Sequence, residues 1–319
     1  MQATRVRLGM RVLGTALAAI GLATVVAVVQ PAGASDYEDP FFLNWPEFLP
    51  ASPTEYTVST DVDCRNGKNK CVDKVIKEMT KRYNRLGCDH DSTFAFTYLL
   101  TTEEYRQAVE DPDFFEDNAF VNNQDAVFAD YYFDQFDDWQ RGKIEEVSPA
   151  WRIAFQTAED EAVTGMGNVF LGMNAHVNRD LPFVLEAIGL TKPDGTSRKA
   201  DHDRVNDFLA AVNQYLLVEA AKYLDPTLDD GDVPGTSIDN STAVQALVAW
   251  REQAWRNAER LAGAATTAER DQIAHEIEQA AALEALVIRE NFSYGPLHTL
   301  QGTDRAARNA FCAANFEDR

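Results

Sequence analysis

The strongest constraint on the fold of this chain is a helical repeat of apolar residues. Val72, Val75, Ile76 and Met79 recur at intervals of three or four, and Gly87 follows them as a helix stop. The same period predicts helices over further segments, at residues 92–100, 113–141, 160–189 and 203–224. No alternating pattern typical of strands competes with it. The sequence therefore predicts an all-α, multi-helix bundle without significant sheet.

Turn and capping residues divide this helical chain. Thr102 predicts the start of a short helix, Ser148 before Pro149 another start, and Pro182 a bend. Two long patterns around Gly263 predict an antiparallel hairpin. We expect a signal peptide at 1–34, an extended segment at 35–70, a helical core domain carrying the candidate site at 71–224, a linker at 225–240, and the hairpin with a tail packed on the core at 241–319.

The first residues have the three parts of a secretory signal peptide. Three arginines precede an apolar run at 12–29, and small residues end at Ala34. The alternative is a membrane anchor, because a run of 18 apolar residues could just span a bilayer. Pro31 and the small residues after it favour cleavage after Ala34. We expect a secreted, extracellular protein with no stable membrane anchor after cleavage.

The net charge limits the partners. Removing residues 1–34 would take the formal charge from −22 to about −25. Such an acidic chain repels nucleic acid and anionic lipid, so no nucleic-acid partner is expected. We therefore expect the partner to be a small molecule or a protein.

Four cysteines follow the apolar run, and an even count in an oxidising compartment predicts two disulfides. Three pairings are possible. We favour Cys64 with Cys71 and Cys88 with Cys312, the second tying the last part of the chain to an early helix. A metal cluster is the alternative, although the spacings match no Cys-x-x-Cys pattern.

The most informative segment for function is 165–182. At about 100° of turn per residue, His176 and Asp180 share a helix face with glycine and apolar residues. Gly165 and Gly172 each cost a helix about 1 kcal/mol against alanine, which favours a close approach of another backbone or a ligand.

Buried polar groups need partners, so two interpretations stay open for this pair. Asp180 could simply accept a proton from His176 in a core clamp, or both could face a cavity as metal ligands or acid–base groups. Asn174, Asn178 and Arg179 lie beside them. Arg179 could hold an anion or pair with an acid.

Three more residues could join this site. His202 falls on an inward stripe beside Asp201 and Asp203, whose simplest role is to cap a helix. Asp125 lies on an otherwise aromatic face, as a ligand, a base or a hydrogen-bond acceptor. His90 could join them, or lie on the surface beside Cys88.

The stretch 172–182, with 125–134 upstream and 202–206 downstream, resembles a bacterial family of helical proteins of unknown function. The resemblance runs from Cys71 to Tyr223, and more loosely through the helix with Trp250 and Trp255. It implies an all-α fold and a shared site around His176, Asn178 and Asp180, and no activity.

His176, Asp180 and Pro182 are also similar to a helix of zinc-dependent phospholipase C and the single-strand nucleases. That resemblance implies an exported, all-helical phosphoesterase that holds zinc through His and Asp residues. The chain has only five histidines and none just after Pro182. At most one or two divalent metals, zinc or similar, would be held, by His176, Asp180, His202, Asp125 and His90.

Three functions follow from these residues. The first is a secreted metal-dependent hydrolase with water on a metal at His176, Asp180 and His202 and with Asp125 as base or further ligand. The second is a non-catalytic helical protein with a buried clamp. The third is a metal-independent enzyme with His176 as base, oriented by Asp180. The first requires the side chains of His176, Asp180 and His202 to converge within about 5 Å.

Overall fold

The computed structural model describes residues 67–229 and 238–319, and these ranges are helical, with no strand longer than an isolated bridge. The all-α prediction is therefore confirmed for them. The elements are α1 (Asn69–Leu86), α2 (Ser92–Ala108), α3 (Asn118–Gln140), η2 (Ile144–Glu146), α4 (Pro149–Glu159), α5 (Gly165–Asn174), η3 (Ala175–Asp180), α6 (Leu181–Ile188), α7 (Lys199–Tyr223), η4 (Pro226–Leu228), α8 (Ile238–Gly263), α9 (Thr267–Asn291), α10 (Pro296–Gln301) and α11 (Arg305–Asn315).

Helix α2 differs from its prediction. It runs unbroken through Thr102, because the threonine hydroxyl donates to the Tyr98 carbonyl at 3.0 Å and does not cap a new helix. α3 begins only at Asn118, where the Asp117 side chain accepts from the Phe120 amide.

Two further helix starts are also displaced. α5 begins at Gly165 instead of residue 160, because Thr164 accepts from the Gly167 amide. α7 begins at Lys199, so neither aspartate beside His202 is its cap. The Asp201 carboxylate accepts from the amides of residues 116 and 117, which holds the turn before α3.

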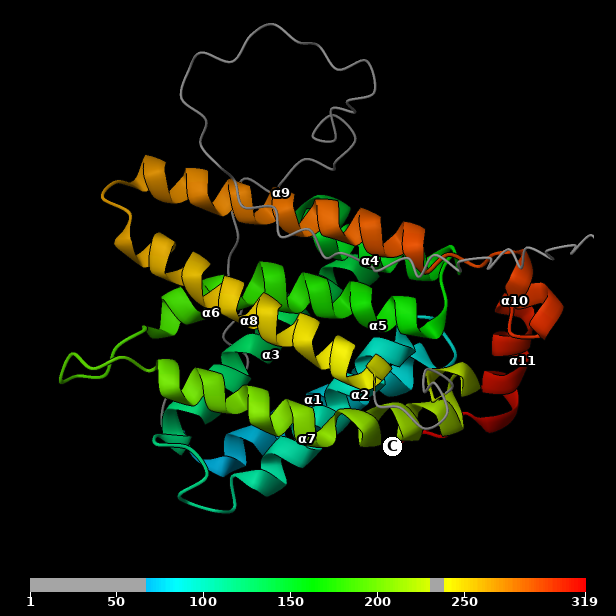
Figure 1. Cartoon of the computed structure of the whole chain (residues 1–319), viewed down its shortest axis with the longest axis horizontal. Coiled ribbons are helices and arrows are strands. Elements are labelled where there is room, and N and C mark those ends of the chain that lie inside the picture. The colour runs from blue at the N-terminus through cyan, green and yellow to red at the C-terminus, as the bar shows by residue number, and fades with distance from the viewer. Residues whose placement is uncertain (1–66, 230–237) are drawn as a thin grey trace, which may run out of the picture. The chain divides into compact units, whose positions relative to one another are not determined.

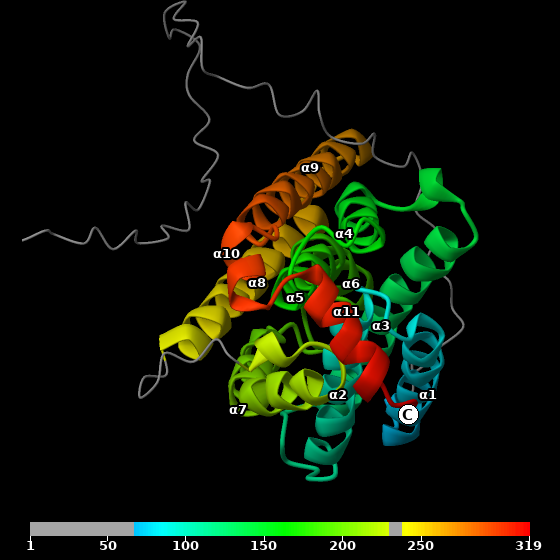
Figure 2. The same cartoon turned by 90° about the vertical axis from the view of Figure 1, so that its right-hand side faces the viewer.

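The long hairpin formed by α8 and α9 is present as predicted, with the two helices side by side in both views (Figures 1 and 2). Both pack on the segment α5–η3–α6. That segment is buried among α3, α4, α8 and α9, so it lies in the main core. Trp151, Leu171, Leu181 and Trp255 are among its buried side chains.

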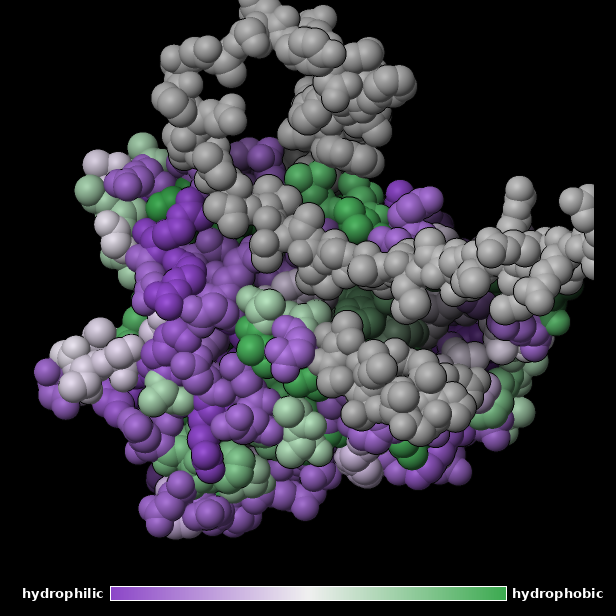
Figure 3. All heavy atoms as spheres, viewed as in Figure 1, coloured by the Kyte–Doolittle hydropathy of each residue, from purple (hydrophilic) through white to green (hydrophobic). Residues whose placement is uncertain are grey.

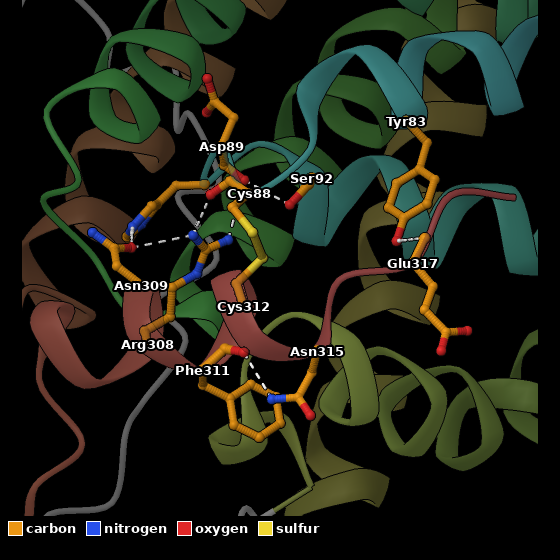
Figure 4. Close-up of a disulfide and its surroundings, with 11 residues drawn as sticks. Tyr83, Cys88, Asp89, Ser92, Arg308, Asn309, Phe311, Cys312, Asn315 and Glu317 are labelled. Atoms are coloured by element: carbon orange, nitrogen blue, oxygen red, sulfur yellow. Dashed lines mark hydrogen bonds between the residues drawn. A yellow bond between two sulfur atoms is a disulfide. The ribbon is translucent and has the colours of Figure 1, made fainter.

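Helix α11 packs against α7, and α10 lies between the end of α9 and α11 (Figure 2). The predicted Cys88–Cys312 disulfide joins α11 to the turn between α1 and α2, with Cα atoms 5.7 Å apart. Beside it the buried Arg308 donates to the carbonyls of Cys88 and Asp89 (Figure 4). Cys64 lies outside the described residues, so its pairing with Cys71 stays a prediction.

On the face shown in Figure 3 most described residues are hydrophilic, with hydrophobic residues in smaller separate patches. No helix within residues 67–229 and 238–319 is long and apolar enough to cross a membrane. The predicted signal peptide, the segment 35–66 and the linker residues 230–237 lie outside the described residues.

Candidate functional site

The site is built on η3, a widened, π-helical turn that joins α5 to α6 without a break. Pro182 has no N–H, and in a regular α-helix its ring would clash with the carbonyl of residue 178. Widening the turn is a known solution to such a conflict, and π-turns often occur at functional sites. All six residues of η3 are buried, so each polar side chain there must find a partner inside the protein.

Asp180 is the centre of the contacts in this turn. Its Oδ2 accepts from Trp151 Nε1 at 2.9 Å and lies 3.0 Å from His176 Nδ1. Its Oδ1 accepts from Arg179 Nη1 at 2.8 Å. The carboxylate is fully buried, and three donors from two helical segments fix its orientation.

Arg179 links this carboxylate to the hairpin. Its Nε and Nη2 lie 2.8 and 2.6 Å from Glu278 Oε1 on α9. One buried guanidinium therefore faces two carboxylates, Asp180 and Glu278, and it is not available to hold an anionic ligand. The prediction that Arg179 pairs with acids is the interpretation that this geometry supports.

His176 lies in a cage of aromatic rings. Its ring stacks on Phe128 at 3.5 Å with an interplanar angle of 4°, and the Tyr98 ring lies 4.8 Å away. Phe94, Tyr132 and Trp151 complete the cage at centroid distances of 6.0 to 6.2 Å. This burial lowers the pKa of His176, although the nearby Asp180 acts in the opposite direction.

The two ring nitrogens of His176 have different environments. A neutral imidazole with its proton on Nδ1 donates to Asp180, which is the tautomer that the hydrogen-bond pattern assigns. Nε2 then carries a lone pair. It is buried and has no partner among the described residues.

Two further polar atoms at this cage are also buried without a partner in the described part of the chain, the Tyr98 hydroxyl and Asp125 Oδ2. Burial raises the pKa of Asp125 to about 7. Asp125 was among the site residues predicted from the sequence, and Tyr98 was not. A tyrosine within the apolar run 92–100 was the available signal, because a buried hydroxyl needs a partner.

The asparagines of the segment connect η3 to α9. Asn178 Nδ2 donates to Asn174 Oδ1 and to Glu284 Oε2, both at 3.0 Å. Asn174 Nδ2 donates to the Ala281 carbonyl at 2.8 Å. These contacts hold the turn in place and do not reach the His176 ring cage.

Close packing accounts for the two glycines. A Cβ atom on Gly172 would lie 2.2 Å from the Phe94 ring, so only glycine lets this ring reach the cage. A Cβ on Gly165 would meet the Asp225 carboxylate at 2.5 Å. The close approach expected at these glycines is therefore made by side chains and not by another backbone or a ligand.

The other two candidate histidines lie in different surroundings. His202 is buried on α7 beside α8, with Nε2 3.0 Å from the Arg251 carbonyl and Nδ1 3.4 Å from Arg251 Nη2. His90 is buried, not on the surface, and its Nε2 lies 2.9 Å from Asn309 Oδ1 near the disulfide.

The structure thus joins His176 to Asp180, brings Asp125 near the Tyr98 hydroxyl, and places His202 and His90 elsewhere. Within the described ranges, no three or more His, Cys, Asp or Glu side chains gather in a way that could hold a metal ion.

Comparison with known proteins gives one match. A family model described as a family of unknown function (DUF5995) covers residues 72–291, which confirms the resemblance seen in the sequence. No curated protein and no solved structure matches the chain.

Proposed function

For this chain, which belongs to the family of unknown function DUF5995, we propose a hydrolase activity in which His176 acts as the general base. The observation that carries this proposal is the unequal use of the imidazole. Nδ1 is bonded to a fixed carboxylate, whereas Nε2 is buried with no partner among the described residues. A base of this kind can take a proton from a water molecule as the water attacks a substrate.

Asp180 would act by orienting His176. A carboxylate bonded to Nδ1–H holds the imidazole in one tautomer and stabilises the imidazolium that forms during the reaction. Trp151 and Arg179 keep that carboxylate in place. General-base catalysis by such a positioned group contributes roughly 10²- to 10⁴-fold to a rate.

The geometry favours direct proton transfer over a metal-bound water. A metal ion needs several converging ligands, and the ring nitrogens of His202 and the Nε2 of His90 face Arg251 and Asn309. A divalent metal with His176 and Asp180 as ligands stays a separate prediction, which a chelator tests.

The main competing function is a non-catalytic binding or structural protein in which His176 and Asp180 form a clamp. The three donors on Asp180 support this alternative. A clamp gives no role to the free Nε2 atom, so removal of that atom separates the two functions.

We also propose that the protein is exported, with cleavage after Ala34. The Cys88–Cys312 disulfide supports this proposal, because such bonds persist in oxidising compartments. Mass spectrometry of the protein recovered from the culture medium tests it. A mature chain that begins at residue 35 is expected, and an intact cell-bound chain would contradict the proposal.

The activity is tested with p-nitrophenyl acetate, p-nitrophenyl butyrate and p-nitrophenyl phosphate, with and without EDTA. We expect hydrolysis that falls at least 100-fold in His176→Gln. His275→Gln is the matched control, because His275 is exposed on α9, and its rate should not change. Equal rates in the two variants, or no turnover of any probe, would contradict the hydrolase. Loss of activity with EDTA would establish the metal-dependent mechanism instead.

A further inference from the structure

Three elements each bring a buried, unpartnered polar atom to the same ring cage. They are the Tyr98 hydroxyl on α2, Asp125 Oδ2 on α3 and His176 Nε2 on η3. A buried polar atom without a hydrogen bond lowers stability, so proteins keep such atoms mainly where a ligand, a water or a reaction uses them.

The contacts of these residues place the three atoms in one neighbourhood. The Tyr98 ring lies 4.8 Å from the His176 ring, Phe128 stacks on the His176 ring at 3.5 Å, and the Tyr98 and Phe128 rings are 6.2 Å apart. Asp125 precedes Phe128 by three residues, so the two share a face of α3. The Asp125 and Asp180 charges both act on the Tyr98 hydroxyl.

This neighbourhood also has a side that is nearer to solvent. Tyr98, Asp125 and Phe128 are only partly buried, whereas His176 beneath them is 3% exposed. A small ligand would therefore meet Tyr98 and Asp125 before it reaches Nε2. Because Phe128 stacks on the His176 ring at 3.5 Å, a ligand could enter only after the Phe128 or Tyr98 ring had moved.

The charges around the cage select an uncharged ligand. Asp180 and Asp125 are the acids beside His176, and Arg179 is already engaged by Asp180 and Glu278. An anion such as a phosphate would lie beside the Asp180 carboxylate, with no unengaged cation among the described residues of the cage, inside a shell of aromatic rings where charge is poorly solvated. The phosphoesterase that the weaker sequence resemblance implied does not fit this environment.

We propose that Tyr98 and Asp125 complete the His176 site and bind the carbonyl group of a small uncharged ester or amide. This inference rests on the proposed function and names its substrate class. Tyr98 donates a hydrogen bond from its hydroxyl group to the carbonyl oxygen and keeps its proton. Asp125 acts in its protonated form as the acid for the leaving group.

The reaction balances with water as the only other reactant. His176 Nε2 takes one proton from water while the water oxygen forms a bond to the carbonyl carbon. The bond from that carbon to the leaving oxygen or nitrogen then breaks, and Asp125 gives its proton to the leaving atom. The proton on His176 returns to Asp125 through solvent, which leaves a carboxylic acid with an alcohol or amine.

The protonation states agree with these roles. Burial raises the pKa of Asp125 to about 7, so its carboxyl group keeps its proton in mildly acidic solution. Burial also lowers the pKa of His176, which keeps the base neutral there. The Asp125 charge raises the pKa values of Tyr98 and Tyr105 from α2, and Asp180 from η3 opposes the lowering of the His176 pKa.

The binding test uses benzamide and benzoate, which have the same shape and differ in charge. Both are titrated into the purified protein at pH 6 by NMR. Benzamide should bind at least tenfold more tightly than benzoate, and Tyr98→Phe should weaken benzamide about tenfold through the lost hydrogen bond. Tyr215→Phe is the control, because Tyr215 is exposed on α7, and it should not change the affinity.

The kinetic test uses ethyl acetate, because its alkoxide leaving group, unlike p-nitrophenolate, needs a proton from an acid to depart. In the wild type the rate should fall as the pH rises through about 7, and Asp125→Asn should lower the rate and remove that limb of the profile.

The outcomes separate this inference from the proposed function. Equal binding of the two probes, no binding of either, or equal effects of Tyr98→Phe and Tyr215→Phe would overturn the inference. Hydrolysis that needs His176 and is indifferent to Tyr98 and Asp125 would overturn it and leave the proposed function standing. Selective binding of benzamide without hydrolysis of any ester would support the ligand site and contradict the hydrolase.

Discussion

Two helical segments of this protein each bury a histidine next to an arginine, and they use them differently. His176 in η3 and His202 in α7 are 3% and 1% exposed, and burial lowers the pKa of both. Both ring nitrogens of His202 have partners on Arg251. His176 uses only Nδ1, and its Nε2 has no partner among the described residues.

The arginines differ in the same way. Arg251 donates to neutral acceptors, Asn206 Oδ1 and the His202 carbonyl, and burial lowers its pKa to about 10. Arg179 faces two carboxylates. The His202 region is thus a clamp between α7 and α8 in which one buried cation has neutral partners, whereas the His176 region is a network of paired charges that orients one free base. The comparison suggests a criterion: a buried histidine is a candidate functional residue when one of its ring nitrogens has no hydrogen-bond partner.

The largest expected effect is the loss of the carboxylate that organises the His176 region. Asp180→Ala would remove the acceptor of Trp151 Nε1 and Arg179 Nη1 and leave Arg179 with Glu278, and we expect a loss of about 3–5 kcal/mol in the free energy of unfolding. Asp203→Ala, which removes an exposed acid beside His202, should stay within about 0.5 kcal/mol. Urea denaturation measures both, and similar losses would break the comparison.

The next largest effect is the difference in stability between alanine variants of the two histidines. His202→Ala removes two hydrogen bonds and leaves buried Arg251 short of a partner, while His176→Ala removes one. We expect His202→Ala to destabilise the fold by about 1–2 kcal/mol more than His176→Ala. The reverse order in thermal or urea unfolding would show that His176 is the structural histidine of the pair.

The acid beside His176 predicts a pH dependence of stability. The pKa of Asp125 is raised in the folded protein, so the folded state binds more protons than the unfolded state between about pH 4 and 7. The contribution of Asp125 to stability should therefore be fully present below about pH 4 and be lost as the pH rises to about 7, by up to about 1.4 kcal/mol per pH unit. Asp125→Asn should flatten this slope. An unchanged slope in the variant would contradict the burial of this carboxyl group.

The smallest effect compares two tyrosines of α2. The Tyr105 hydroxyl donates to Asn122 at 2.7 Å, whereas the Tyr98 hydroxyl has no partner in the described part of the chain. Tyr105→Phe should cost about 1 kcal/mol, and Tyr98→Phe should be neutral or slightly stabilising. Equal losses in the two variants would mean that the Tyr98 hydroxyl is bonded in solution.

The sequence was sufficient for the helical class, the α8–α9 hairpin, the Cys88–Cys312 disulfide and the inward face shared by His176 and Asp180. The helical features depend on local period and spacing, and the disulfide was one of only three possible pairings of four cysteines. The starts of α5 and α7 were misjudged, because capping and turn contacts compete over a few residues. The place of Tyr98 beside His176 and the partners of His202 could not be predicted, because they depend on how distant helices pack.

The most direct test of the account is the tautomer of each buried histidine, read from long-range ¹H–¹⁵N NMR of ¹⁵N-histidine-labelled protein at pH 7. The account predicts that His176 carries its proton on Nδ1 and has an unprotonated Nε2. It predicts the opposite for His202, which donates from Nε2 to the Arg251 carbonyl. A proton on Nε2 of His176, or a doubly protonated ring, would contradict its role as a free base.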